Sequence, residues 1–487
     1  MKVIVALLCL YASAQAKSST VLLPGKSPLI TFRFVFLTGA ASDPADKPGL
    51  ANLTCETLAL SGTKQKTYKQ VVDALFPMAV SIESYTDKQM MTFTAETHVD
   101  NLEKFYTLFK AMLLEPGWRE EDFRRVKDDQ INALKITLRG NNDEELAKEE
   151  LYNLLYAGHP FGHANLGTIS SLEKLTLDDV KAFYKTQLTK GNLIIGLAGG
   201  YPANFPARVE KDFSALPGAS PSPAALPVPP QFEGNSLTVL RKDTRSVAYS
   251  LGFPLDVNRG DPDFPALLLT QSYFGQHREF GGRLYQRMRE LRGLNYGDYA
   301  YIEYFPNGVY SFEPSPNLAR RQQIFQIWIR PVEVPTAAFG LKLAMFELDK
   351  LVKEGISEEE FQRTRSFISK QVNLLTKTKS AELGYAIDSE FYGIGNYNST
   401  IKTALMSLTR DQVNAAIRRH LRSDNVRIVA VAKDADGLKE KLMSGMATPM
   451  TYNSPKDSAV MAEDKTVESW NLRIKEATIV PVEQVFQ

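Results

Sequence analysis

The sequence predicts an α+β protein made of a duplicated unit, with sheets that carry helices on one face. Three observations support this. Strand-like and helix-like segments are grouped rather than strictly alternating, which favours sheets covered by helices on one face. Two stretches of the first half recur in the second half in the same order, and a Pro-rich segment separates the halves. The length of 487 residues also agrees with more than one domain.

The internal repeat carries most of this prediction. The segment 175–180, Leu-Thr-Leu-Asp-Asp-Val, is matched by 408–413, Leu-Thr-Arg-Asp-Gln-Val, and each precedes an apolar strand. The segment 120–123, Glu-Glu-Asp-Phe, is matched by 358–361, Glu-Glu-Glu-Phe, and each opens a long charged helix. Two matches in one order, with nearly equal offsets, favour a duplicated unit of about 220 residues.

The first half supplies the expected elements in order. Phe- and Val-rich or alternating stretches predict strands, and capped periodic stretches predict helices. Two neighbouring strands, 79–83 and 90–94, are joined by a polar turn at 86–88, and the sequence does not decide which of them is an edge strand. The other expected strands are 29–37 and 193–198, and the expected helices are 48–60, 68–75, 100–114, 120–138, 144–155 and 177–187.

The chain divides into five predicted segments. Residues 1–16 have an early Lys, an apolar run and a closing Ala-Gln-Ala, which indicates a signal peptide and export to the periplasm or the medium. A buried first strand or an uncleaved anchor is the alternative. The predicted remainder is an N-terminal domain at 17–217, a Pro-rich linker at 218–232, a C-terminal domain at 233–445 and a surface tail at 446–487.

Composition excludes several classes of function. A net charge of +1 offers no field for nucleic acid, and no nucleic-acid motif is present. After residue 16, no apolar stretch is long enough to span a bilayer, so no transmembrane segment is expected in the mature chain. Of the two cysteines, Cys9 lies in the predicted leader, which leaves Cys55 without a disulfide partner.

One helix organises the functional interpretation. The stretch 48–58 begins with a Pro-Gly turn and places Asn52, Cys55 and Glu56 at positions i, i+3 and i+4. This spacing puts the three side chains on one helix face. In a metalloprotease helix, two His and a catalytic Glu occupy such positions.

The segment 38–63 resembles the insulinase/pitrilysin family of zinc peptidases, in which it reads G-L-A-H-x-x-E-H-M. Here Asn52 and Glu56 stand at the two His positions, and Cys55 stands at the Glu position. The family's third ligand, a Glu, falls on Asn132 or on Ala133. The resemblance covers both halves and implies two homologous α/β-roll domains, each an antiparallel sheet with helices on one face. It also implies a degenerate zinc site that binds no metal.

A second resemblance lies in the C-terminal half. The two-chain bacterial members of the family contribute an Arg and a Tyr to the partner's active site, within the pattern S-R-L-x-x-x-x-R-E-x-x-G-L-x-Y. Residues 282–296 of this chain place Arg289 and Tyr296 at these positions. In that role they would stabilise an oxyanion. The alternative is an amphipathic helix with a solvated Arg, followed by a Gly turn.

These features predict a non-catalytic subunit that completes the active site and peptide chamber of a homologous zinc-bearing peptidase. Its ligand would be an unfolded peptide, bound by strand addition at a sheet edge. Zinc is expected in the partner, and no cofactor is expected in this chain. One alternative is a stand-alone peptide-binding or assembly protein. Another is an active metallopeptidase with an atypical metal set or with Cys55 as nucleophile.

Overall fold

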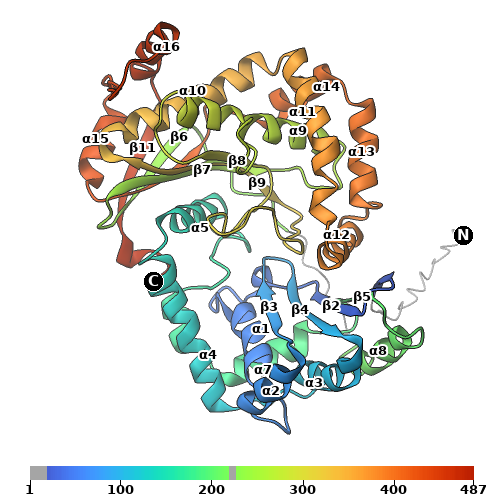
Figure 1. The fold of residues 1–487 in the computed structure, drawn as a ribbon. Helices are drawn as coiled ribbons and strands as arrows, with labels where there is room; N and C mark the ends of the chain where they lie inside the picture. The colour runs from blue at the N-terminus through green and yellow to red at the C-terminus, as the bar shows by residue number, and fades with distance from the viewer. Residues whose placement is uncertain (1–18, 219–225) are drawn as a thin grey trace, which may run out of the picture.

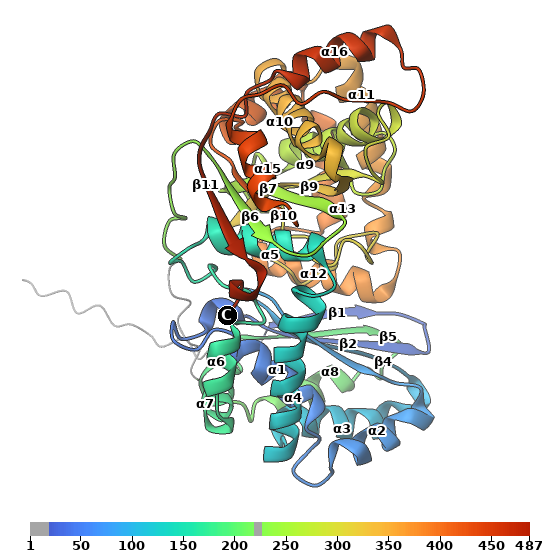
Figure 2. The same cartoon turned by 90° about the vertical axis from the view of Figure 1, so that its left-hand side faces the viewer.

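The computed structural model describes residues 19–218 and 226–487. The predicted leader and the centre of the predicted linker lie outside these ranges. Two halves of similar build are stacked on each other, with the N-terminal half below and the C-terminal half above in Figure 1. Each half holds one sheet with most of its helices on the outer face (Figures 1 and 2). The two predicted α/β rolls are therefore confirmed.

The two sheets share one topology, which confirms the internal repeat. The first has the order β1-β5-β2-β4-β3 and the second has the order β11-β6-β10-β7-β9-β8. Strand β1 pairs parallel with β5, as β6 does with β10, and the other pairs common to both sheets are antiparallel. The strands are β1 Ser19–Pro24, β2 Leu29–Phe36, β3 Ile82–Thr86, β4 Met91–His98, β5 Leu193–Gly199, β6 Asn235–Arg241, β7 Ser246–Leu255, β8 Asp298–Tyr301, β9 Gln323–Glu333, β10 Arg427–Ala432 and β11 Ile474–Pro481.

The parallel pairs refine the expected antiparallel sheets. A parallel pair needs a long crossover instead of a tight turn, so no local turn signal in the sequence marks it. Strands β1 and β5 are separated by most of the N-terminal half, and β6 and β10 by most of the C-terminal half.

The helices also follow the repeat. Helices α7 and α14 begin with equivalent capping boxes at Thr176 and Thr409. In each box the Thr side chain accepts a hydrogen bond from the N–H of the third helical residue, and the side chain of that residue accepts one from the Thr N–H. The expected helix 120–138 is divided into α4 and a π-helical turn, Ala133–Leu138. The helices are α1 Leu50–Leu60, α2 Tyr68–Leu75, α3 Leu102–Leu114, α4 Glu120–Asn132, α5 Asp143–Leu155, α6 Ile169–Lys174, α7 Leu177–Gln187, α8 Phe205–Phe213, α9 Phe264–Gly275, α10 Ala337–Glu354, α11 Glu358–Gln371, α12 Lys379–Tyr392, α13 Tyr397–Ser407, α14 Arg410–His420, α15 Ala435–Met443 and α16 Ser458–Glu468. Among the described residues, no helix has both the length and the apolar character to cross a membrane.

The core of the first half begins with the alternation of β2. Phe32 and Phe34 point to one face of the sheet and are fully buried. Their rings make edge-on contacts with Phe105 and Phe109 of α3, at 5.0 Å between centroids in each case. The opposite face of β2 carries Arg33, among other residues, and looks toward the second half.

The two halves exchange equivalent helices. Helix α5 leaves the first half and packs on β7, β10 and β9, while α12 of the second half packs on β5, β1 and β2 (Figure 1). Within α5, Lys148 lies over the ring of Trp328 at 3.8 Å and pairs with Glu145 at 3.0 Å. A helix of the other half thus covers part of each inner sheet face, which fixes the halves against each other.

The tail corrects the prediction of a segment wrapped on the surface. Strand β11 extends the second sheet by parallel pairing with β6. The chain then crosses to the first half (Figure 2), where Val485 and Phe486 are buried in its core. The N–H groups of Ile169 and Ser170 donate to the carbonyls of Phe486 and Gln487, at 3.0 and 2.8 Å. The tail therefore ties the two halves together.

The predicted polar turn 86–88 is not a solvated turn. Asp87 and Lys88 are buried between the halves, because the 302–322 connection of the second half covers them and pairs Arg320 with Asp87.

Candidate functional site

The turn at the N-terminus of helix α1 sets the position of the helix. Gly49 has a left-handed backbone, with φ of 98°, and an added Cβ would lie 2.7 Å from the carbonyl oxygen of Leu166. The carboxylate of Asp43 accepts from the N–H groups of Gly49 and Ala51, both at 2.7 Å, and so takes the place of a side-chain cap. Helix α1 packs against β3, α4 and α7. The predicted turn thus sets the direction of the helix.

The face of α1 at which the sequence predicts a degenerate zinc site carries side chains that are buried or already hydrogen-bonded. Asn52 is buried, and Cys55 is fully buried. Burial and the neighbouring Glu56 charge raise the pKa of the Cys55 thiol well above its usual value, so it stays protonated. The Glu56 carboxylate accepts from the Ser84 hydroxyl of β3 at 3.1 Å.

Asn132, at the position predicted for the family's third zinc ligand, does not point toward α1. Asn132 is solvent-exposed at the end of α4, where the π-helical turn begins. Gln130 is the α4 side chain that reaches the start of α1, because its amide donates to the carbonyls of Gly49 and Leu166 at 3.1 and 2.8 Å. Sequence reasoning missed this residue.

This donor set does not fit zinc. A zinc site of the peptidase type needs three nitrogen, thiolate or carboxylate ligands and one open position. Here the face offers an amide, a protonated thiol and one engaged carboxylate. Within the described ranges, no group of three or more His, Cys, Asp or Glu is arranged to hold a metal. No hydrolytic step is therefore derived from this helix.

The Arg and Tyr predicted in the second half lie at its surface. Arg289 is the penultimate residue of the π-helical turn Tyr285–Glu290. It donates to Glu290 at 2.8 Å and lies over the Tyr285 ring, 5.0 Å from its centroid. Tyr296 follows the left-handed Gly293 and is 80% exposed. Both side chains are thus accessible to another molecule.

A polar cavity of about 440 Å³ lies beside the degenerate helix. Its floor is the inner face of β2, β4 and β3, and its roof belongs to the 302–322 connection. Ser84, which holds Glu56, lines it. Sequence reasoning missed this cavity. The alternation of β2, with Phe32 and Phe34 on one face, was the only signal that Arg33 points the other way.

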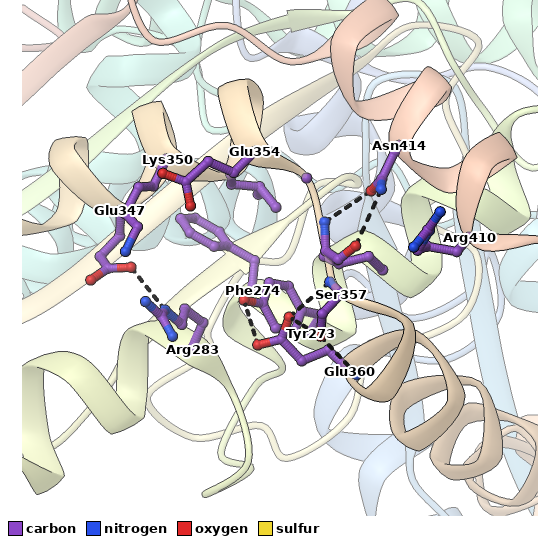
Figure 3. Close-up of a pocket in the computed structure, with 13 residues that line it drawn as sticks. Tyr273, Phe274, Arg283, Glu347, Lys350, Glu354, Ser357, Glu360, Arg410 and Asn414 are labelled. Carbon is purple, nitrogen blue, oxygen red and sulfur yellow. Dashed lines mark hydrogen bonds and ion pairs between the residues drawn. The ribbon is translucent and has the colours of Figure 1, made fainter.

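Another cavity, of about 580 Å³, opens between α9, α10, α11 and α14 (Figure 3). Two contacts engage part of its polar lining. Arg283 donates to Glu347 at 2.8 Å, and the Tyr273 hydroxyl donates to Glu360 at 3.1 Å. The first contact joins α10 to the segment that follows α9, and the second joins α9 to α11. None of the site residues predicted from the sequence lines this cavity.

The fold and the site define a class: a two-domain peptidase fold in which the metal-binding helix has lost its donors. Comparison with known proteins agrees. Residues 26–168 match the family model described as Insulinase (Peptidase family M16), and residues 174–367 match the one described as Peptidase M16 inactive domain. The chain belongs to the insulinase family, peptidase family M16.

Individual relatives are distant but cover most of the chain. It is similar to the non-peptidase homolog YmxG of Helicobacter pylori, at 22% identity over 83% of this chain and 89% of the relative. It is also similar to an uncharacterized zinc protease of Rickettsia bellii, at 23% identity over 74% and 83%. A peptidase M16 inactive domain from Pseudomonas fluorescens has the same fold, with a TM-score of 0.74, 22% identity, and coverage of 85% and 95%.

Proposed function

We propose that this chain is the non-catalytic subunit of an exported, two-chain metallopeptidase. It would pair with a homologous zinc-bearing chain, contribute Arg289 and Tyr296 to that chain's active site, and help to enclose an unfolded peptide. The observation that carries the proposal is the donor set of α1, which does not fit zinc. The similarity to a relative named a non-peptidase homolog, over 83% of this chain, supports the same conclusion.

The chemistry of the proposed pair is electrostatic. Zinc in the partner would supply the Lewis acid. Arg289 and Tyr296 would donate hydrogen bonds to the substrate carbonyl oxygen as negative charge builds on it. Arg289 first has to leave Glu290, and an exposed pair of this kind contributes only about 0–1 kcal/mol.

The sheet edge offers a place for the peptide. Strand β3 is the outer strand of the first sheet, and β4 is interior. This resolves the choice that the sequence left open. An extended peptide would pair with the outer edge of β3.

Affinity purification from the native host, with zinc measured on the recovered complex, tests the partner role. We expect a homologous chain that carries H-x-x-E-H, and zinc bound to that chain. Recovery of this chain without such a homologue would contradict the proposal.

One structural observation favours the alternative of a stand-alone protein. The exchanged helices and the C-terminal tail close the chain on itself, which suits a stand-alone peptide-binding or assembly protein. That protein would bind peptides without any homologous partner in the same purification.

A further inference from the structure

The 440 Å³ cavity lies on the part of the first sheet that the exchanged helix leaves open. Helix α12 covers β5, β1 and β2, so the inner face of β4 and β3 remains uncovered. The 302–322 connection forms the opposite wall, with Pro306, Asn307 and Ser311 among its lining residues. The volume is that of a small-molecule or short-peptide site.

Arg33 is the buried charge of this cavity. Its side chain is only 9% exposed, and it donates to Asn317 at 2.8 Å and to Ser380 at 3.1 Å. Its Nε is buried without a hydrogen-bond partner. Among the described residues, no carboxylate lies within ion-pair distance of this guanidinium. The Asp388 and Glu83 carboxylates both act on the Arg33 charge from beyond that distance, and Asp388 is itself held by Arg259 at 3.2 Å. An unpaired buried guanidinium is costly, so a carboxylate ligand would stabilise it.

Glu83 supplies the opposite charge. Arg33 of β2 and Glu83 of β3 are both in register with Thr94 of β4, so the three residues form one row across the sheet. Glu83 is exposed at the rim, and no ion pair engages it within the described part of the chain. Hydroxyl groups of Thr92, Thr94, Ser311 and Ser315 also line the cavity.

The spacing of the two strand positions that carry Arg33 and Glu83 suggests the length of the ligand. Two steps between neighbouring strands span roughly 10 Å. An extended chain of about three residues covers the same distance, at roughly 3.3–3.6 Å per residue. A free, extended tripeptide therefore has its ammonium and carboxylate groups about as far apart as the backbone positions of Glu83 and Arg33.

We infer that this cavity binds a short free peptide of about three residues, with its carboxylate at Arg33 and its ammonium group at Glu83. The inference rests on the proposed function only in taking the ligand to be a peptide. The charges and the hydroxyl lining belong to this chain alone and need no partner subunit.

Isothermal titration of the full chain, without any partner, with trialanine tests this. Trialanine should bind, and both trialanine amide and N-acetyl-trialanine should bind at least about tenfold more weakly, each lacking one charge-assisted contact. Arg33→Gln should weaken trialanine similarly, whereas Arg241→Gln, an exposed pair on β6, should not. Absence of trialanine binding, or equal binding of the blocked peptides, would overturn the inference.

A second variant covers the case in which Arg33→Gln does not fold. Glu83 is exposed, so Glu83→Gln should leave the fold intact. In that variant, trialanine and N-acetyl-trialanine should bind with equal affinity, because the ammonium has lost its counter-charge. A persistent preference for the free amine would contradict the assignment. Since no partner is present, failure here leaves the subunit role standing, and failure of the subunit role leaves this binding intact.

Discussion

Asp87 and Arg320 form a fully buried ion pair that joins the two halves. Asp87 lies between β3 and β4, Arg320 lies before β9, and the Nε to Oδ2 distance is 2.7 Å. The guanidinium also lies over the ring of Tyr304, 3.7 Å from its centroid. The pair explains why a turn that the sequence predicts as polar is buried.

Removal of one partner from this pair should be severe. Asp87→Asn leaves the Arg320 charge buried without compensation, and we expect a loss of about 3–5 kcal/mol in the free energy of unfolding. Urea unfolding of the purified chain measures it. The double variant Asp87→Leu/Arg320→Met should be less destabilised than the single one. A single-variant loss below about 1 kcal/mol would mean that the pair does not join the halves.

The C-terminal tail should act as a clip between the halves. Phe486 is buried in the first half, so Phe486→Ala should cost about 3–5 kcal/mol, as for other buried Phe side chains. Limited proteolysis should also become faster, because the halves are less firmly held together. Met461→Ala on α16, an exposed position, is the matched control. Proteolysis at the wild-type rate would argue against the clip.

Stability should fall as the pH rises through the range in which Asp298 titrates. Burial raises the pKa of Asp298 to about 8, although Asn295 and the nearby Arg330 lower it. The folded chain therefore holds a proton that the unfolded chain releases above its ordinary pKa of 3.8. By linkage, stability decreases from about pH 4 to about pH 8, by up to about 1.4 kcal/mol per pH unit from this group.

Asp298→Asn isolates this contribution. Urea unfolding at pH 5 and pH 8 should show a smaller loss of stability in the variant than in the wild-type chain. An equal loss in both would assign the pH dependence to other groups, such as Asp43, whose pKa is also raised by burial, to about 7.

The Arg and Tyr pair can be tested in the assembled peptidase. Arg289→Ala or Tyr296→Phe should lower turnover by on the order of 10²-fold, the scale of one lost oxyanion donor. The chain should still fold, because both side chains are accessible at the surface. Arg410→Gln, at another exposed ion pair, is the control. Unchanged turnover in both variants would rule out the proposed role.

Local signals in the sequence predicted much of the fold. The matched segments 175–180 and 408–413 predicted the repeat, and the Phe- and Val-rich stretch 29–37 predicted strand β2. Non-local pairing could not be predicted. Strand β11 joins β6 across more than half of the second domain, and α5 looks like a surface helix because its buried Glu144, Glu145 and Lys148 are polar.

In the candidate site, too, local features could be predicted from the sequence and non-local ones could not. The positions of Asn52, Cys55 and Glu56 on one helix followed from their spacing. The cavity did not, because Arg33 meets Asn317 across 284 residues of sequence, and only the stacking of the halves brings them together. Gln130 was missed because nothing in its local pattern marks it as the α4 residue facing α1.

The central claim is that α1 lacks the donors for zinc, and elemental analysis of the purified chain tests it most directly. After dialysis against a zinc-containing buffer and then a metal-free buffer, we expect the chain to retain far less than one equivalent of zinc. One equivalent of retained zinc, lost on substitution of Glu56 by Gln, would contradict it.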